Sequence, residues 1–410
     1  MKKTILFISF LILSCNSDVK SDNPILNFQN ELIKNEVTGS NVFKMVKGGK
    51  VIYNEVVNSG KQGDKDINDQ TIFPIWSMSK PITTVAIMVL YDRGLFELQD
   101  NLSKYLPEYE NVKCKGEDGI YPCKNKIKVI DLLTHRSGYT YYSDVYGENK
   151  FISPPSPTNK FTSSYHFDNL DDFSKAVANQ PLEFEPGSHY LYGLNQAILG
   201  RLVEVLSGVS FYDFLKVNLF DPMGMTETKF YLTTEERTRI QPLFINRLPN
   251  TPFNPSDTSL KGFTYLLDEQ TYDINNYAHY GGEGLVSTFS DYSNFCEMLV
   301  NKGNYKGKKI ISESSYNLMI KKYTNTAPDP DEPFIFPDLE GHYFGFTFSV
   351  MEDAILDGTG SPEGVFGWSG YHNTHFWIDP ENKIYGLFMS RSREFNFDIS
   401  KGLKKAVYSK

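Results

Sequence analysis

Residues 73–90 read FPIWSMSKPITTVAIMVL and contain a Ser-x-x-Lys step from Ser77 to Lys80. Apolar residues recur at helical spacing after this step, and Gly94 offers a stop, so the stretch predicts a helix. Pro81 fits only the first turn of that helix, because its ring would clash with the carbonyl group four residues back. Ser77 is therefore expected at the helix N-terminus, with Lys80 three residues on and on the same face.

This spacing suits nucleophilic catalysis. A serine hydroxyl is a poor nucleophile until a neighbouring base takes its proton. A lysine amine can be that base only if its pKa falls well below its free value of about 10.4, and burial and the positive end of a helix dipole both lower it. The motif has only two fixed residues, and Ser17 to Lys20 is a second match, so the assignment of Ser77 and Lys80 depends on the rest of the chain.

Length and composition limit the classes of function. The chain has 410 residues, 40% of them hydrophobic, which allows two to three domains or one large enzyme. The 41 basic and 50 acidic residues give a net charge of −9. A nucleic-acid-binding protein would need a basic face, so no nucleic-acid partner is expected, and this acidity indicates solubility.

The N-terminus reads as an export signal. Lys2 and Lys3 precede an apolar run, and small Ser14 precedes Cys15. The residues up to Cys15 resemble a bacterial lipobox, in which the cysteine is lipidated; the alternative is an ordinary signal peptide with an incidental cysteine. The apolar run is too short for a transmembrane helix. We expect residues 1–15 as a lipoprotein signal, residues 16–25 as a tether, and an exported protein held at the membrane by its lipid anchor alone, facing the periplasm or the cell exterior.

Three cysteines remain in the mature chain. Cys114 and Cys123 flank a Gly- and Pro-containing loop, and an exported chain permits a disulfide between them; free thiols are the alternative. Cys296 lies in an apolar helical pattern and is expected to be a buried thiol. Because no Cys/His cluster has metal-ligand spacing, neither a metal nor another cofactor is expected.

Strand signals lie at both ends of the chain. Residues 41–46 and 50–57 alternate around Gly48-Gly49, which predicts a β-hairpin. Strand-like runs return after residue 340, and helical patterns fill the middle: strands at 343–350, 371–378 and 384–389; helices at 171–178, 195–206, 211–220, 291–299 and 399–408; a long loop at 139–164. The predicted fold is α/β (α+β), with an antiparallel sheet in a domain of residues 26–90 plus 281–410 and an inserted, mostly helical domain at 91–280.

Several segments carry more information together than apart. They follow one another in a fixed order: Ser77–Lys80, Ile130–Gly138, Pro186-Gly187 with Tyr192, Asp221–Met225, Gly281–Thr288, and Phe366–Gly370 followed by Trp377–Pro380. In this order they resemble the serine β-lactamase and penicillin-binding protein-like family, specifically the class C-like group with its related esterases. The resemblance spans nearly the whole mature chain.

The resemblance implies roles for individual residues. Ser77 matches the acylated nucleophile and Lys80 its proton-accepting partner. The tyrosine of the second motif falls on Tyr192, which keeps the usual distance to Leu199-Gly200, or on Tyr190, the alternative assignment.

The third motif falls on Trp368-Ser369-Gly370. The family's oxyanion hole then uses the backbone N–H groups of Ser77 and Tyr371. Earlier in the chain, His135 has two interpretations, a catalytic group or a hydrogen-bonded histidine that fixes a turn, and the second is preferred.

Two departures from the family pattern bear on the substrate. Leu194 stands where β-lactamases carry the asparagine that binds the substrate amide, and Asn195 comes one residue late. Trp368 stands where β-lactamases place a lysine near the substrate carboxylate, and a Trp-x-Gly third motif is similar to the esterases of this fold. Loss of both polar groups weakens recognition of β-lactams; a distant cation, Arg391 or Arg393, is the alternative partner for a carboxylate. The expected pocket is lined by Leu194, Asn195, Trp368, Ser369 and Gly370.

These points predict a serine hydrolase that acts through an acyl-enzyme, a carboxylesterase on small neutral esters. An alternative enzyme is a DD-peptidase, another amide hydrolase or a weak β-lactamase acting on a peptide-like substrate. An alternative outside the enzymes is an acyl-binding sensor that is acylated and does not turn over. Ester turnover separates the first reading from the last. The sequence leaves the oligomeric state open.

Overall fold

The computed structural model describes residues 23–141, 164–245, 262–265, 271–325 and 339–408. Its centre is one eight-stranded sheet with the order β11-β12-β13-β14-β15-β16-β1-β2, in which every pair is antiparallel. The strands are β1 (Asn41–Lys47), β2 (Lys50–Val57), β11 (Thr324–Asn325), β12 (His342–Phe344), β13 (Ser349–Met351), β14 (Phe366–Gly370), β15 (Thr374–Asp379) and β16 (Ile384–Met389). Cys15, the predicted signal segment and most of the predicted loop at 139–164 lie outside the described residues.

The two ends of the chain meet within this sheet. β16 lies between β15 and β1, with Met389 opposite both Thr374 and Val42. The predicted hairpin of β1 and β2 is confirmed, as is the antiparallel sheet built from both ends of the chain.

One predicted strand is wrong. Residues 343–350 form two short strands, β12 and β13, joined by a turn in which Thr347 has a φ of +72°. Gly345 belongs to this turn, and a Cβ atom there would come within 2.2 Å of the Met319 carbonyl oxygen. The apolar run is continuous in sequence, but the backbone has to reverse in its middle.

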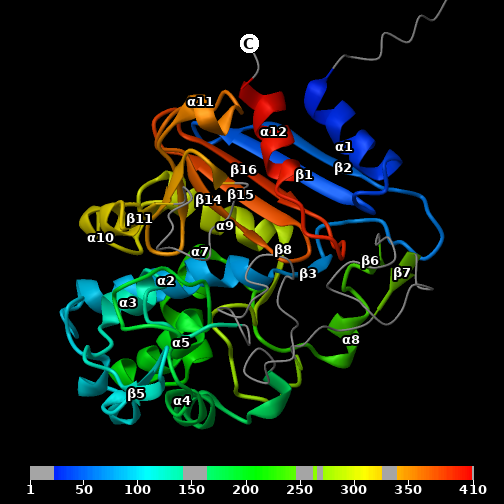
Figure 1. Ribbon diagram of the computed structural model, residues 1–410. Coiled ribbons are helices and arrows are strands. Elements are labelled where there is room, and N and C mark those ends of the chain that lie inside the picture. The colour runs from blue at the N-terminus through cyan, green and yellow to red at the C-terminus, as the bar shows by residue number, and fades with distance from the viewer. Residues whose placement is uncertain (1–22, 142–163, 246–261, 266–270, 326–338, 409–410) are drawn as a thin grey trace, which may run out of the picture.

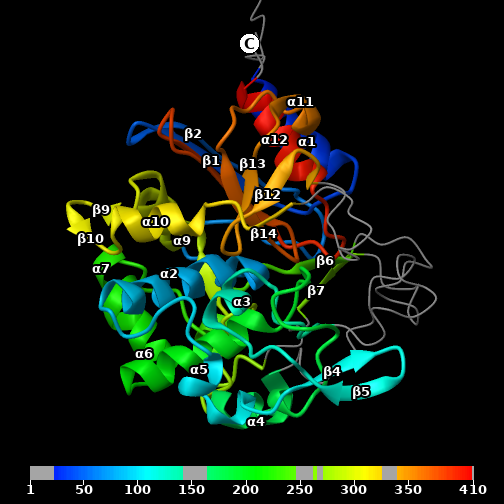
Figure 2. The same cartoon turned by 60° about the vertical axis from the view of Figure 1, so that its left-hand side comes forward.

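Helices cover both faces of the sheet. α1 (Pro24–Lys34) and α12 (Asp398–Tyr408) lie side by side on one face, at the top of Figures 1 and 2. α1 begins inside the segment predicted as a tether, because the Asn23 side chain accepts hydrogen bonds from the first-turn N–H groups and Pro24 suits the first helical position. This outer face packs one apolar cluster: Ile25, Leu32, Phe43, Tyr53, Met351, Val365, Trp377, Phe388, Ile399 and Leu403.

The other face carries α9 (Phe289–Val300) and, below it, the helical layer around α2 (Ser79–Asp92). Every residue of α2 from Ser79 to Leu90 is buried, so α2 is a core helix enclosed on all sides. The other helices are α3 (Val129–Leu133), α4 (Leu170–Ala178), α5 (Asn195–Ser207), α6 (Phe211–Leu215) with a π-helical continuation (Lys216–Phe220), α7 (Asp221–Met223), α8 (Thr234–Arg237), α10 (Glu313–Met319) and α11 (Ala354–Asp357). In the described part of the chain, none of the helices is long and apolar enough to cross a membrane.

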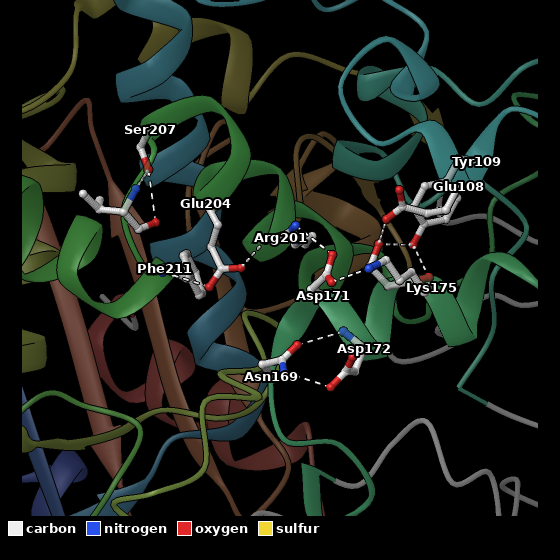
Figure 3. Close-up of polar contacts among 12 residues, drawn as sticks. Glu108, Tyr109, Asn169, Asp171, Asp172, Lys175, Arg201, Glu204, Ser207 and Phe211 are labelled. Atoms are coloured by element: carbon white, nitrogen blue, oxygen red, sulfur yellow. Dashed lines mark hydrogen bonds and ion pairs between the residues drawn. The ribbon is translucent and has the colours of Figure 1, made fainter.

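A polar network fixes α4 against α5 (Figure 3). Arg201 donates to Asp171 at 2.8 Å and to Glu204 at 3.0 Å, and Glu204 also accepts from the Phe211 backbone N–H. Lys175 reaches Asp171 from the next turn of α4. α5 in turn packs on α2, so this network supports the layer that contains α2.

Short hairpins and turns complete the fold. Cys114 and Cys123 are joined in a disulfide across the hairpin of β4 and β5, and Cys296 is a buried free thiol in α9. The two-stranded pairs are β3 (Ile72–Pro74) with β8 (Val286–Thr288), β4 (Lys113–Gly116) with β5 (Gly119–Pro122), β6 (Leu243–Ile245) with β7 (Gly262–Thr264), and β9 (Asn304–Tyr305) with β10 (Lys308–Lys309); the 3-10 turns are Trp76–Met78, Leu102–Lys104, Pro107–Tyr109 and Ser164–His166.

Candidate active site

Ser77 lies in a tight 3-10 turn, Trp76–Met78, that leads directly into α2. Trp76 has a φ of +46°, a left-handed conformation that a bulky residue rarely adopts. Its indole N–H donates to His372 Nδ1 at 3.0 Å, and its ring meets the Tyr371 ring edge-on at 5.4 Å. These contacts hold a strained backbone immediately before Ser77, as is common at catalytic sites.

Strand β14 closes on this turn at Gly370. A Cβ atom at Gly370 would come within 2.3 Å of the Ile75 carbonyl oxygen, so only glycine permits the approach. Tyr371, whose N–H group is predicted to form the oxyanion hole with that of Ser77, follows at the end of the strand and packs on Trp76. The end of β14 and the Trp76–Met78 turn are therefore neighbours. An oxyanion hole formed by the N–H groups of Ser77 and Tyr371 requires this.

Lys80 lies three residues after Ser77, in the first turn of α2, and is fully buried. Its Nζ atom lies 3.1 Å from Ser77 Oγ and 2.8 Å from the Gly282 carbonyl oxygen. Burial lowers the pKa of Lys80 to about 8, although the Glu283 carboxylate acts in the opposite direction. A substantial share of the amine is therefore neutral in mildly alkaline solution and can accept a proton from Ser77.

Tyr192 is the second side chain in contact with Ser77 Oγ. Its hydroxyl donates to Ser77 Oγ at 2.7 Å, and burial raises its pKa above the ordinary value, so the phenol is protonated at neutral pH. Tyr190 instead stacks its ring on Phe344, with centroids 4.5 Å apart and planes within 6°. Of the two tyrosines considered from the sequence, the structure brings Tyr192 to Ser77.

His135 and Asn195 support the loop that carries Tyr192. His135 Nδ1 lies 2.9 Å from the Asn195 amide nitrogen, and the His135 carbonyl accepts from Leu191 N at 2.7 Å. Asn195 Oδ1 accepts from Ser137 at 2.6 Å. Asn195 was predicted to line the pocket, but both ends of its amide are used by these buried neighbours. The structure agrees with the interpretation of His135 as a residue that fixes a turn.

Trp368 points from β14 toward the catalytic side. Its ring lies 5.8 Å from that of Tyr192 and 6.0 Å from that of Phe344, centroid to centroid. Leu194 is buried at the start of α5. Ser369 differs from its predicted place in the pocket: successive side chains of a strand alternate between faces, and Ser369 bonds His375 Nδ1 at 2.7 Å.

The two arginines considered as carboxylate partners lie after β16. Arg391 is buried and donates to the Gln241 carbonyl at 2.9 Å. The Arg393 guanidinium lies 5.8 Å from the centre of the Tyr371 ring. Arg393 is thus the one of the two placed beside the predicted oxyanion residue.

Sequence reasoning missed two residues of the site. Tyr141 donates to Glu283 Oε2 at 2.8 Å, and that oxygen lies 3.9 Å from Lys80 Nζ. Gly282 permits this assembly, because a Cβ atom there would come within 2.7 Å of the Tyr141 hydroxyl. The sequence feature that could have pointed to Glu283 is its position as a lone carboxylate among glycines and apolar residues, in Gly281–Val286.

One group of three residues in the described ranges has metal-ligand proximity: Cys114, Cys123 and Glu185. The two cysteines are joined to each other, whereas a metal binds the free thiolate. This group therefore does not fit a metal site in the oxidised protein.

Comparison with known proteins identifies the family. A sequence profile for the family described as Beta-lactamase matches residues 31–405. The chain belongs to the Beta-lactamase family. The match spans every segment used for the resemblance, so the predicted family and the predicted fold are confirmed.

Individual relatives agree with this membership. An uncharacterized protein of Mycobacterium tuberculosis is 28% identical over 342 residues, which cover 78% of this chain and 77% of that protein. Lovastatin esterase of Penicillium rubens is 25% identical over 385 residues, covering 88% and 90%. The solved structure of EstCE1, described as a hydrolase with promiscuous acyltransferase activity, has a TM-score of 0.74 at 21% identity and covers 94% of this chain and 98% of its own. The expectation of a serine hydrolase is confirmed at the level of this Beta-lactamase family.

Proposed function

We propose that the protein is a serine carboxylesterase that acts on small neutral esters through an acyl-enzyme. The observation that carries this proposal is the convergence on Ser77 Oγ of Lys80 Nζ at 3.1 Å and the Tyr192 hydroxyl at 2.7 Å. A nucleophile in contact with a buried base and a second proton carrier is the arrangement that acyl transfer needs.

The reaction follows from these contacts. Ser77 Oγ bonds to the ester carbonyl carbon as its proton passes to Lys80, and the carbonyl oxygen becomes an oxyanion between the N–H groups of Ser77 and Tyr371. The bond to the leaving oxygen then breaks, and the proton on Lys80 reaches that oxygen, with Tyr192 as the nearest relay. Water attacks the acyl-enzyme in the same way and releases the acid.

The walls of the site support neutral substrates. By the family resemblance, Trp368 and Leu194 match the positions where β-lactamases carry a lysine and an asparagine, and the Trp368 ring lies beside that of Tyr192. An apolar pocket discriminates by about 1–3 kcal/mol per methylene, whereas a site built for hydrogen bonds rejects unsuitable analogues far more strongly. We infer broad, modest activity on short esters and very poor hydrolysis of penicillins. The lovastatin esterase relative supports an ester substrate.

A p-nitrophenyl ester series of increasing acyl length, measured beside nitrocefin on wild type and Ser77→Ala, tests the proposal. Wild type should hydrolyse the short esters and Ser77→Ala should not. Nitrocefin turnover equal to that of p-nitrophenyl butyrate would favour a β-lactamase. Labelling of Ser77 by a fluorophosphonate without ester turnover would favour the acyl-binding sensor, and turnover of a D-Ala-D-Ala peptide alone would favour the DD-peptidase.

We also propose that the protein is an exported lipoprotein anchored through Cys15 and facing the periplasm or the cell exterior. Two lysines, a short apolar run and the lipobox-like residues that end at Cys15 support this. The described residues begin at Asn23, the cap of α1. Metabolic labelling with a radioactive fatty acid should mark the wild type and not Cys15→Ser, and equal labelling of both would contradict the proposal.

A further inference from the structure

We propose that Glu283 is a positioning residue for the acyl-transfer step, whose carboxylate holds Lys80 in place and stabilises the ammonium group formed when Lys80 takes the Ser77 proton. This inference rests on the proposed function, because it concerns the base of that reaction. It assigns a role to a residue that belongs neither to the Ser-x-x-Lys step nor to the tyrosine motif.

The geometry places Glu283 directly behind Lys80. Glu283 Oε2 lies 3.9 Å from Lys80 Nζ, and both side chains are almost completely removed from solvent. The adjacent Gly282 carbonyl accepts from the same Nζ at 2.8 Å. One loop therefore presents a carbonyl dipole and a carboxylate to the amine, while Ser77 lies within hydrogen-bond distance of that amine.

The carboxylate is itself held in place. The Tyr141 hydroxyl donates to the oxygen of Glu283 that faces Lys80, at 2.8 Å. Tyr141 also lies against Lys80, with its ring centre 5.1 Å from Nζ. A carboxylate fixed by a hydroxyl donor, rather than by bulk water, keeps its position when the charge on Lys80 changes.

The chemistry calls for a negative group at this point. Before the reaction Lys80 is neutral; as Ser77 Oγ bonds to the acyl carbon, Lys80 gains the serine proton and becomes a cation in a buried site. An unpaired buried cation is strongly disfavoured, and a carboxylate 3.9 Å away offsets that cost. Glu283 would act on Lys80 as the third member of a catalytic triad acts on its base: it orients the base and stabilises the charged form.

The groups that face the pair come from several elements. Lys80 is surrounded by the rings of Tyr141 and Tyr192 and by Ser77, and its charge acts on buried His135. Glu283 acts on Tyr192 and on Tyr280 of its own loop. Burial raises the pKa of Tyr192 and of Tyr280, so these two phenols are protonated at neutral pH, and burial lowers the pKa of His135. Among these groups, Glu283 is the acidic side chain that lies next to Lys80.

The test compares two isosteric pairs, Glu283 with Glu283→Gln, and Glu283→Asp with Glu283→Asn. The members of each pair differ in charge at nearly constant shape. The rate of Ser77 labelling by a fluorophosphonate and kcat/KM for p-nitrophenyl butyrate are both measured against pH. Removal of the carboxylate should move the acid limb of both profiles to lower pH by about one to three units, because an opposite charge raises the pKa of a lysine. The plateau rate should fall about tenfold or more.

Glu204→Gln provides the matched control, because Glu204 is also partly buried and paired, but with Arg201 on α5. Its acid limb should coincide with that of the wild type. If the neutral and the charged member of a folded pair have the same acid limb in their pH profiles, the inference is wrong and Glu283 contributes packing alone. If Glu283→Gln does not fold, the comparison of Glu283→Asp with Glu283→Asn decides between these outcomes. Wild type that is labelled but does not hydrolyse esters would overturn the esterase proposal, while the labelling profiles would still decide the role of Glu283.

Discussion

At the scale of single residues, the site is built around Ser77 Oγ, which lies 3.1 Å from Lys80 Nζ and 2.7 Å from the Tyr192 hydroxyl. Ser77 and Lys80 are one helical turn apart, so local sequence determines their relation. Tyr192 could be assigned only from the order of the motifs along the whole chain. Glu283 reaches Lys80 from about 200 positions away, and the outward turn of Ser369 depends on the phase of β14, so neither followed from spacing.

The pH dependence of the wild type follows from Lys80. Burial lowers its pKa to about 8, and only the neutral amine accepts a proton. We expect kcat/KM to rise with pH through about 8 and to fall as pH drops below it. A pH series with p-nitrophenyl butyrate measures this, and a rate that is flat through that range would contradict Lys80 as the base.

The two tyrosines offer a matched comparison. Tyr192→Phe removes the hydroxyl that donates to Ser77 at 2.7 Å and should lower kcat/KM by about a hundredfold or more, the usual size of a positioned proton carrier. Tyr190→Phe keeps the ring stacked on Phe344 and should change kcat/KM only a few-fold. The reverse order would move the assignment to Tyr190.

At the scale of elements, strand β14 connects the sheet to the nucleophile turn. The sequence marked its residues as a motif, and the helices of the middle segment followed from their periodicity. The reversal between β12 and β13 could not be predicted from the sequence, because tertiary contacts impose this turn and the apolar run itself does not indicate it. The same limit applies to β14, whose contact with Ile75 is visible only in three dimensions.

Gly370→Ala tests this connection. The added methyl group would lie 2.3 Å from the Ile75 carbonyl oxygen, so β14 and the nucleophile turn must separate. We expect a loss of about 1–3 kcal/mol in the free energy of unfolding and a large fall in kcat/KM. Ser369→Ala alters the neighbouring residue on the opposite face and should leave kcat/KM close to that of the wild type. Denaturant titration and ester kinetics measure both, and equal kinetic effects of the two variants would contradict this account.

At the scale of the whole molecule, the two faces of the sheet have different tasks. The face under α1 and α12 packs apolar side chains. Trp368 projects from the opposite face, toward the turn that holds Ser77 and the helix α2 that holds Lys80. The sequence indicated one sheet from both chain ends because strand signals lay at both ends. It did not indicate which helices cover which face, since each amphipathic pattern fits either one.

Leu403→Ala separates stability from catalysis. Leu403 is fully buried between α12 and the outer face, and truncation of such a leucine costs about 2–5 kcal/mol. We expect a lower Tm and an unchanged kcat/KM at 25 °C. Lys405→Ala, at an exposed position of the same helix, should alter neither. A large loss of activity in folded Leu403→Ala would show that the two faces are coupled.

The position of β16 between β15 and β1 determines when the sheet can be completed during synthesis of the chain. The hairpin of β1 and β2 leaves the ribosome early, but its neighbour in the sheet is among the last segments to be made. At about 5–20 residues per second, the hairpin waits for tens of seconds with one edge unpaired. A chain that stops before Ile384 lacks that neighbour, so a premature stop near the end of the gene removes β16 and also separates β1 and β2 from the rest of the sheet.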